Sequence, residues 1–65
     1  MSLLGLEEEL KRQLRVSFND AADHLATGGA KDYAEYRYMT GVVQGLALAE
    51  RALLDLMKIA RQQGD

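Results

Sequence analysis

A single break interrupts the helical periodicity of this 65-residue sequence, at the stretch Thr27-Gly28-Gly29-Ala30-Lys31. On both sides of it, apolar residues recur at intervals of three and four, and nowhere do they alternate long enough to indicate a strand. The chain contains no proline that could end a helix elsewhere. The pattern predicts an all-α fold: one helical-hairpin domain over 1–65, with an antiparallel pair of helices over about 2–27 and 32–63 and a turn over about 28–31.

Both predicted helices have recognisable ends. Ser2 is a suitable N-cap for the first helix, because its hydroxyl can accept a hydrogen bond from a first-turn amide. Asp32 followed by Glu35 is a capping-box pattern, in which each side chain accepts a hydrogen bond from a backbone amide at the start of the second helix. Gly28 or Gly29 can adopt the left-handed conformation that ends the first helix.

The apolar positions predict more packing surface than two helices can cover. The stripe on the first helix consists of Leu3, Leu6, Leu10, Leu14, Phe18, Ala21 and Leu25. A first row on the second helix consists of Met39, Val43, Leu46, Leu53, Met57 and Ala60. A second row, which we call the small-residue seam, consists of Val42, Gly45, Ala49, Ala52, Leu56 and Ile59. One partner helix covers one row, so the seam predicts self-association into a four-helix bundle or larger helical oligomer, a dimer or higher.

Chain length leads to the same expectation. Ordering a residue costs roughly 1.5 kcal/mol of conformational entropy, so a lone chain this short has a net stability near zero. The sequence has no cysteine to form a disulfide. Spacing that places Gly41, Gly45 and Ala49 on one line favours close approach of another helix over a locally kinked helix.

Glu50 occupies a core-type position in the first row, between Leu46 and Leu53. A carboxylate there must reach the solvated edge of the helix pair or find a cationic partner, because burying an unpaired charge is costly. Two partners are available to it: Arg15 on the first helix and Arg51 of a neighbouring chain.

The sequence predicts no catalytic, cofactor-binding or metal-binding residues, and an enzyme is not expected. Asp20 and His24 lie four residues apart, but they supply two ligands where zinc sites use three or four. The lone histidine is expected to be solvated, and no cysteine is present to act as a nucleophile. A formal charge of −2 gives no general reason to bind nucleic acid. No apolar run approaches the ~20 residues of a membrane span, so no membrane association is expected.

Three tyrosines, Tyr33, Tyr36 and Tyr38, surround Arg37 at the start of the second helix. An aromatic and basic surface of this kind can stack on single-stranded nucleic acid. The three positions are expected to point in different directions around the helix, with acidic residues among them. The favoured interpretation therefore places Tyr36 at core spacing and the other two rings at the end of the bundle.

The second helix carries the pattern D-Y-x-E-Y-R…G-x-x-x-G-L-x-L-A-E…D-L, found here at Asp32–Arg37, Gly41–Glu50 and Asp55–Leu56. This pattern resembles a group of small proteins of short-tailed phages that are encoded near the head and portal genes. The resemblance covers about half the chain. It implies a small virion or assembly component, present in the host cytoplasm during infection or in the virion, and it transfers no catalytic residue.

These observations predict a non-catalytic phage structural or assembly protein that acts through helix–helix contacts. Its expected partners are a second copy of itself and a phage head, portal or host protein. The alternative is a small regulatory module: an RNA-binding helical hairpin or an inhibitor of a host protein. The residues expected to contact a partner, if self-association covers the seam, are Arg37, Tyr38, Gln44 and Arg51.

Overall fold

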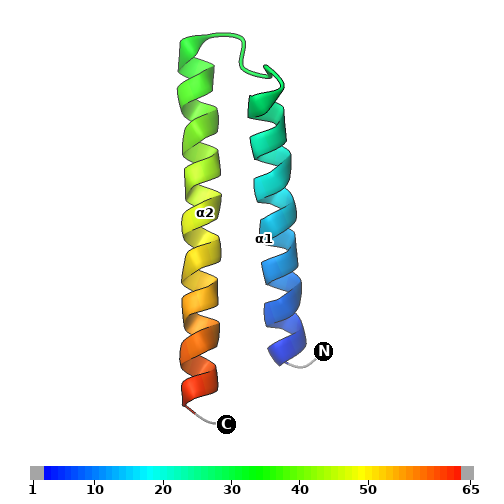
Figure 1. The fold of residues 1–65 in the computed structure, drawn as a ribbon, viewed down its shortest axis with the longest axis vertical. Coiled ribbons are helices and arrows are strands. Elements are labelled where there is room, and N and C mark those ends of the chain that lie inside the picture. The colour runs from blue at the N-terminus through cyan, green and yellow to red at the C-terminus, as the bar shows by residue number, and fades with distance from the viewer. Residues whose placement is uncertain (1–2, 64–65) are drawn as a thin grey trace.

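The computed structural model describes residues 3–63, which form two long antiparallel helices side by side (Figure 1). Helix α1 spans Leu3–Ala26 and helix α2 spans Tyr33–Gln62, and the residues described include no strand. The pair measures 49 × 19 × 13 Å, a single layer of two helices. The predicted all-helical hairpin is confirmed, whereas the predicted cap Ser2 lies outside the described residues.

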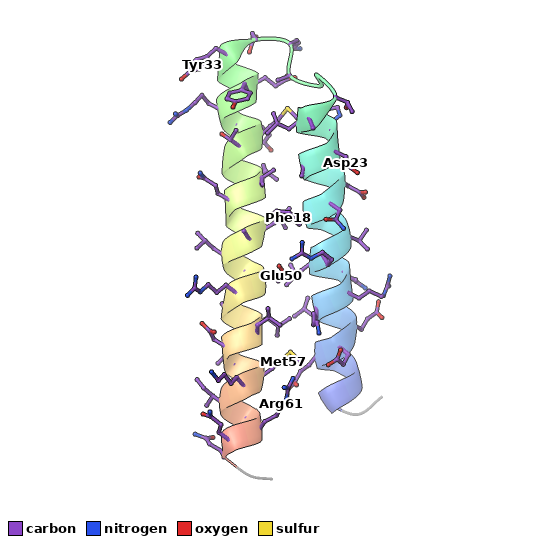
Figure 2. The ribbon with its side chains drawn as sticks, viewed as in Figure 1. Phe18, Asp23, Tyr33, Glu50, Met57 and Arg61 are labelled. Carbon is purple, nitrogen blue, oxygen red and sulfur yellow. The ribbon has the colours of Figure 1, made fainter. Side chains whose placement is uncertain are left out.

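On α2, the first apolar row faces α1, as predicted. Met39, Val43 and Leu46 are partly buried, and Met57 is 3% exposed. The Met57 side chain points toward α1 (Figure 2). The row ends one turn early, because Ala60 is already exposed. Its carboxylate member, Glu50, lies between the two helices and points toward α1 (Figure 2).

On α1, the predicted stripe is correct from Leu14 to Leu25 and wrong at Leu6 and Leu10, while the side chain of its first member, Leu3, lies outside the described part of the structure. Leu6 and Leu10 are 54% and 46% exposed, whereas Glu7 and Lys11 are partly buried. Leu6 lies eight residues before Leu14, which places it about 80° around a helix of 3.6 residues per turn. The row that follows α2 therefore continues through Glu7 and Lys11, while the two leucines turn onto the flank of the hairpin.

The loop between the helices contains two consecutive glycines, Gly28 and Gly29, directly after Thr27. Gly29 N–H donates to the His24 carbonyl at 2.9 Å, and Gly28 N–H donates to the Leu25 carbonyl at 3.2 Å. This pair of bonds is the Schellman arrangement, and it needs a left-handed residue, which is Gly28 at φ 81°. Of the two candidates in the sequence, Gly28 therefore ends α1.

The capping box at the start of α2 is formed on one side only. Asp32 is the N-cap, and its Oδ1 accepts from the Glu35 amide at 2.8 Å. The Glu35 carboxylate does not return the bond to Asp32 as predicted. Its Oε1 accepts instead from the Lys31 amide at 3.3 Å, one residue farther into the loop.

Candidate interaction surfaces

The small-residue seam lies on an exposed side of α2. All six of its residues are exposed, and Leu56 is 63% exposed. At about 100° per residue, the centre of the seam lies about 110° around α2 from the row that faces α1. In a square four-helix bundle, the directions from one helix to its two neighbours differ by roughly 90° around its axis. The seam therefore has the position that a second neighbouring helix would require.

The seam belongs to a broader surface that includes part of α1. A shallow hollow of about 210 Å³ is lined by Ala21 and His24 of α1 and by Tyr38, Met39 and Val42 of α2. Leu6 lies on the same line of α1 as His24, because 18 residues make five helical turns. We call this surface the apolar face, and its members are Leu6, Leu10, Ala21, Val42, Gly45, Ala49 and Leu56.

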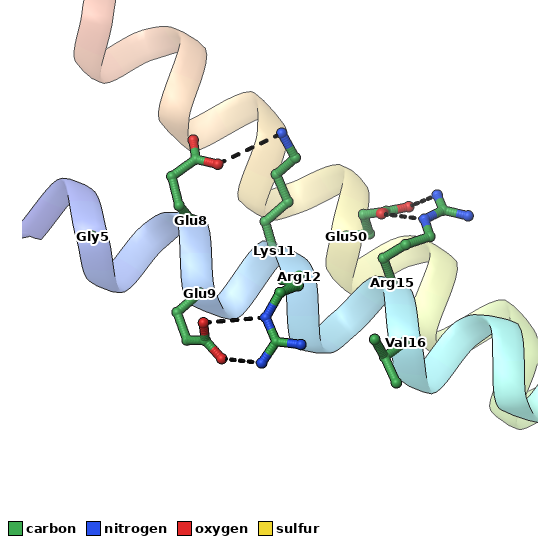
Figure 3. A pocket seen from close by; sticks show the side chains of 8 residues that line it. All are labelled: Gly5, Glu8, Glu9, Lys11, Arg12, Arg15, Val16 and Glu50. Atoms are coloured by element: carbon green, nitrogen blue, oxygen red, sulfur yellow. Dashed lines mark hydrogen bonds and ion pairs between the residues drawn. The ribbon is translucent and has the colours of Figure 1, made fainter.

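The opposite flank of the hairpin is charged. Arg15 lies nine residues before His24, two and a half turns away, and so projects from the other side of α1. Its guanidinium pairs with Glu50 at two points, one of them a 3.0 Å bond from Nε to Oε2 (Figure 3). The same guanidinium lies 5.0 Å from the centre of the Phe18 ring, a cation–π contact. Of the two partners that the sequence offers to Glu50, the hairpin brings Arg15 to it.

A groove of about 550 Å³ follows this charged flank, and its cations are already paired (Figure 3). Lys11 Nζ lies 3.9 Å from Glu8, and Arg12 Nε donates to Glu9 Oε1 at 3.2 Å. The hydrogen bond from Arg12, followed by one from Gln13, lowers the pKa of the Glu9 carboxyl, and the same carboxylate raises the pKa of Arg12. A groove in which acids neutralise the bases offers little attraction to an anionic ligand.

The four predicted partner-contact residues are all exposed, but the structure divides them between two surfaces. Arg37, Gln44 and Arg51 follow one another at intervals of seven and share the outer side of α2. Gln44 and Arg51 line a shallow hollow there together with Ala47 and Leu48. Tyr38 instead lines the hollow of the apolar face. Leu48, an exposed apolar side chain of this outer side, was not among the predicted contact residues.

The tyrosines cluster at the loop end of the hairpin. Tyr33 and Tyr36 stack with ring centroids 6.3 Å apart and planes inclined by 21°, so the expectation that all three rings diverge is wrong. Tyr36 is exposed, which corrects its predicted place in the core. Its position three residues before Met39 turns it about 60° away from the α1-facing row.

His24 contributes to packing in the loop and not to a ligand cluster. A Cβ placed on Gly29 would come within 2.5 Å of the His24 ring, so the imidazole lies directly against the loop backbone. Within residues 3–63, no three histidine, cysteine, aspartate or glutamate side chains gather closely enough to hold a metal ion. Neither helix, over its described length, has the apolar stretch needed to cross a bilayer.

The hairpin thus presents three surfaces: the apolar face, a charged flank whose acidic and basic side chains pair with one another, and the outer side of α2 with its two arginines. The first and third of these can contact another protein, because they present apolar or unpaired side chains to solvent. The likeness of α2 to small phage proteins stays a prediction. Comparison of the chain with protein-family models, with curated proteins and with solved structures found no match.

Proposed function

We propose that this protein is a non-catalytic interaction protein that acts through helix–helix contacts as a homo-oligomer. The observation that carries the proposal is the imbalance between its buried and exposed apolar side chains. Within the described residues, Met57 is the one buried apolar side chain, while eleven large hydrophobic side chains are exposed. A hairpin with so little buried surface gains little hydrophobic free energy from its own fold, and a further helix surface supplies what is missing.

The resemblance of α2 supports a more specific proposal: a small structural or assembly component of a phage, acting in the host cytoplasm or in the virion. In an oligomer that covers the apolar face, the outer side of α2 remains accessible. Arg37, Gln44 and Arg51, with Leu48 between them, then form the surface for a phage head, portal or host protein. Arginine beside an apolar anchor is a common composition for the centre of an interface.

Sedimentation equilibrium over about 1–100 μM tests the self-association, because a chain stabilised by its copies gains stability with concentration. We expect a dimer or higher species, and a melting temperature that rises as the protein is concentrated. A helical monomer with a concentration-independent melting temperature across the whole range would overturn the proposal.

The outer surface is tested by reversing two charges at once, with Arg37→Glu and Arg51→Glu in one chain. This variant should keep its helicity and oligomer size but lose a phage or host protein that the wild type captures and that mass spectrometry identifies. The control carries Lys31→Glu and Arg61→Glu, which changes the net charge equally at other positions, and should retain the partner. If the wild type instead retains RNA, with a steep salt dependence that the first reversal abolishes, the RNA-binding alternative replaces this proposal.

A further inference from the structure

We infer that the apolar face is covered by the same face of a second copy, turned so that the two loops lie at opposite ends of the bundle. In this arrangement α2 lies antiparallel to α2 of the partner, with Ala49 near the two-fold axis and Val42 opposite the partner's Leu56. The inference rests on the proposed self-association and specifies its face and its orientation. Three properties of the hairpin support it: area, shape and charge.

The area of the face suits a second hairpin. In the plane of its two helices the hairpin extends 49 by 19 Å, so this side is broad enough for a partner of the standard interface size, which buries roughly 800 Å² of each surface. A single added helix would cover only about half of that width. A second two-helix hairpin is therefore the smallest occupant that covers both the α1 and the α2 parts of the face.

The shape of the face varies along its length. The loop end has the hollow lined by Ala21, His24 and Val42, among others. The open end carries protruding leucines, Leu6 and Leu10 from α1 and Leu56 from α2. Placing the loops at opposite ends brings the leucines of each copy over the hollow of the other. Placing them at the same end would put leucines against leucines and leave two hollows facing one another, which dense packing disfavours.

The middle of the face is flat and made of small residues. Gly45 and Ala49 carry almost no side chain, and a Cβ built on Gly45 meets nothing within 4 Å. Two α2 helices can therefore approach closely where they pass each other. Val42 and Leu56 each lie seven residues from Ala49, so an antiparallel pair centred there matches a larger side chain with a larger one at both ends.

Charge favours the same orientation. The loop end, residues 19–38, carries four carboxylates and two basic side chains. The open end, residues 5–14 and 53–63, carries four of each. Loops at the same end would bring two acidic ends together, whereas loops at opposite ends place each acidic end beside a neutral one.

Disulfide cross-linking of single-cysteine variants tests the geometry, because the chain has no cysteine of its own. Ala49→Cys should cross-link to itself, since its two Cβ atoms meet near the axis within the few ångströms that a disulfide spans. Leu48→Cys, on the outer side of α2, is the matched control. Ala49→Cys should oxidise to dimer at least about tenfold faster than the control, because proximity raises the effective thiol concentration.

Orientation is read from two further variants, Val42→Cys and Leu56→Cys. Each alone should fail to cross-link to itself, while an equilibrated mixture of the two should yield the mixed disulfide. Self-linking of Val42→Cys, or equal rates for Ala49→Cys and Leu48→Cys, would overturn the arrangement while leaving self-association intact. A monomer in sedimentation equilibrium would instead overturn the proposed function itself, so the two failures are distinguishable.

Discussion

Arg15 on α1 and Glu50 on α2 form a two-point ion pair across the helix interface, with Nε 3.0 Å from Oε2. The pair is asymmetric, because the Glu50 side chain is 14% exposed and that of Arg15 is 51% exposed. Glu50, which lies in an otherwise apolar row, is thus paired with a cation that is itself exposed to solvent. Since a shifted helix would separate the two groups, the pair fixes the register of α1 against α2.

We expect Arg15 and Glu50 to be energetically coupled. A double-mutant cycle with Arg15→Ala and Glu50→Ala should give a coupling of about 1 kcal/mol in the free energy of unfolding, because half of the arginine is screened by water. The Lys11–Glu8 pair, at 3.9 Å and well exposed on both sides, is the control and should couple by less than about 0.5 kcal/mol. Equal couplings for the two pairs would show that the bridge between the helices has no special role.

Association should be sensitive to side-chain size at Gly45. Within one hairpin, a Cβ at Gly45 meets nothing within 4 Å, so Gly45→Leu creates no clash there and removes a helix-weakening glycine. In the oligomer the same leucine should separate the helices and weaken association by about 1–3 kcal/mol, measured by sedimentation equilibrium. Gln44→Leu, on the outer side of α2, should change the association free energy by no more than about 0.5 kcal/mol. Similar dissociation constants for both variants would place the contact elsewhere.

As the pH is lowered, Glu9 should stay ionised to a lower pH than an ordinary glutamate. Hydrogen bonds from Arg12 and then Gln13 hold the pKa of its carboxyl below the ordinary glutamate value in the folded chain. A carboxyl whose pKa is lowered by folding stabilises the fold above its unfolded pKa, and this contribution is lost as the pH falls through the folded pKa. A carbon-detected NMR titration should therefore show a depressed midpoint for Glu9. Arg12→Leu should raise it more than Gln13→Leu does, and Arg51→Leu should leave it unchanged. An ordinary midpoint in the wild type would contradict the structure.

Periodicity and caps were enough to predict the two helices, the loop and the row from Met39 to Met57 that faces α1. These features depend on local spacing, which is visible in a single chain. The predicted positions of Leu6 and Leu10 were wrong because steps of three and four fit either a straight stripe or a heptad row. Only the path of the partner helix decides between them.

The candidate surfaces were harder to predict. Arg37, Tyr38, Gln44 and Arg51 are all exposed, yet Tyr38 belongs to a different side of α2 from the other three. Adjacent residues differ by about 100° in direction, so choosing residues by type alone mixes two faces. The stacking of Tyr33 on Tyr36 has a local signal that could have been used, since residues three apart are neighbours on a helix.

Alanine substitutions should change the free energy of unfolding in opposite directions at the loop and within α2. They should lower it at Gly28 and Gly29 and raise it at Gly41. A Cβ on Gly29 would lie 2.6 Å from the His24 backbone oxygen and 2.5 Å from its ring. Rotation of the imidazole relieves only the second clash, so the loop backbone must move, and Gly29→Ala should lower the free energy of unfolding by about 1–3 kcal/mol. Gly28→Ala should cost about 1–2 kcal/mol through its left-handed backbone. Gly41→Ala, where a Cβ meets nothing within 4 Å, should instead gain up to about 1 kcal/mol from helix propensity. Urea unfolding at one fixed protein concentration measures all three changes, and a stabilised Gly29→Ala would show that the loop does not close as described.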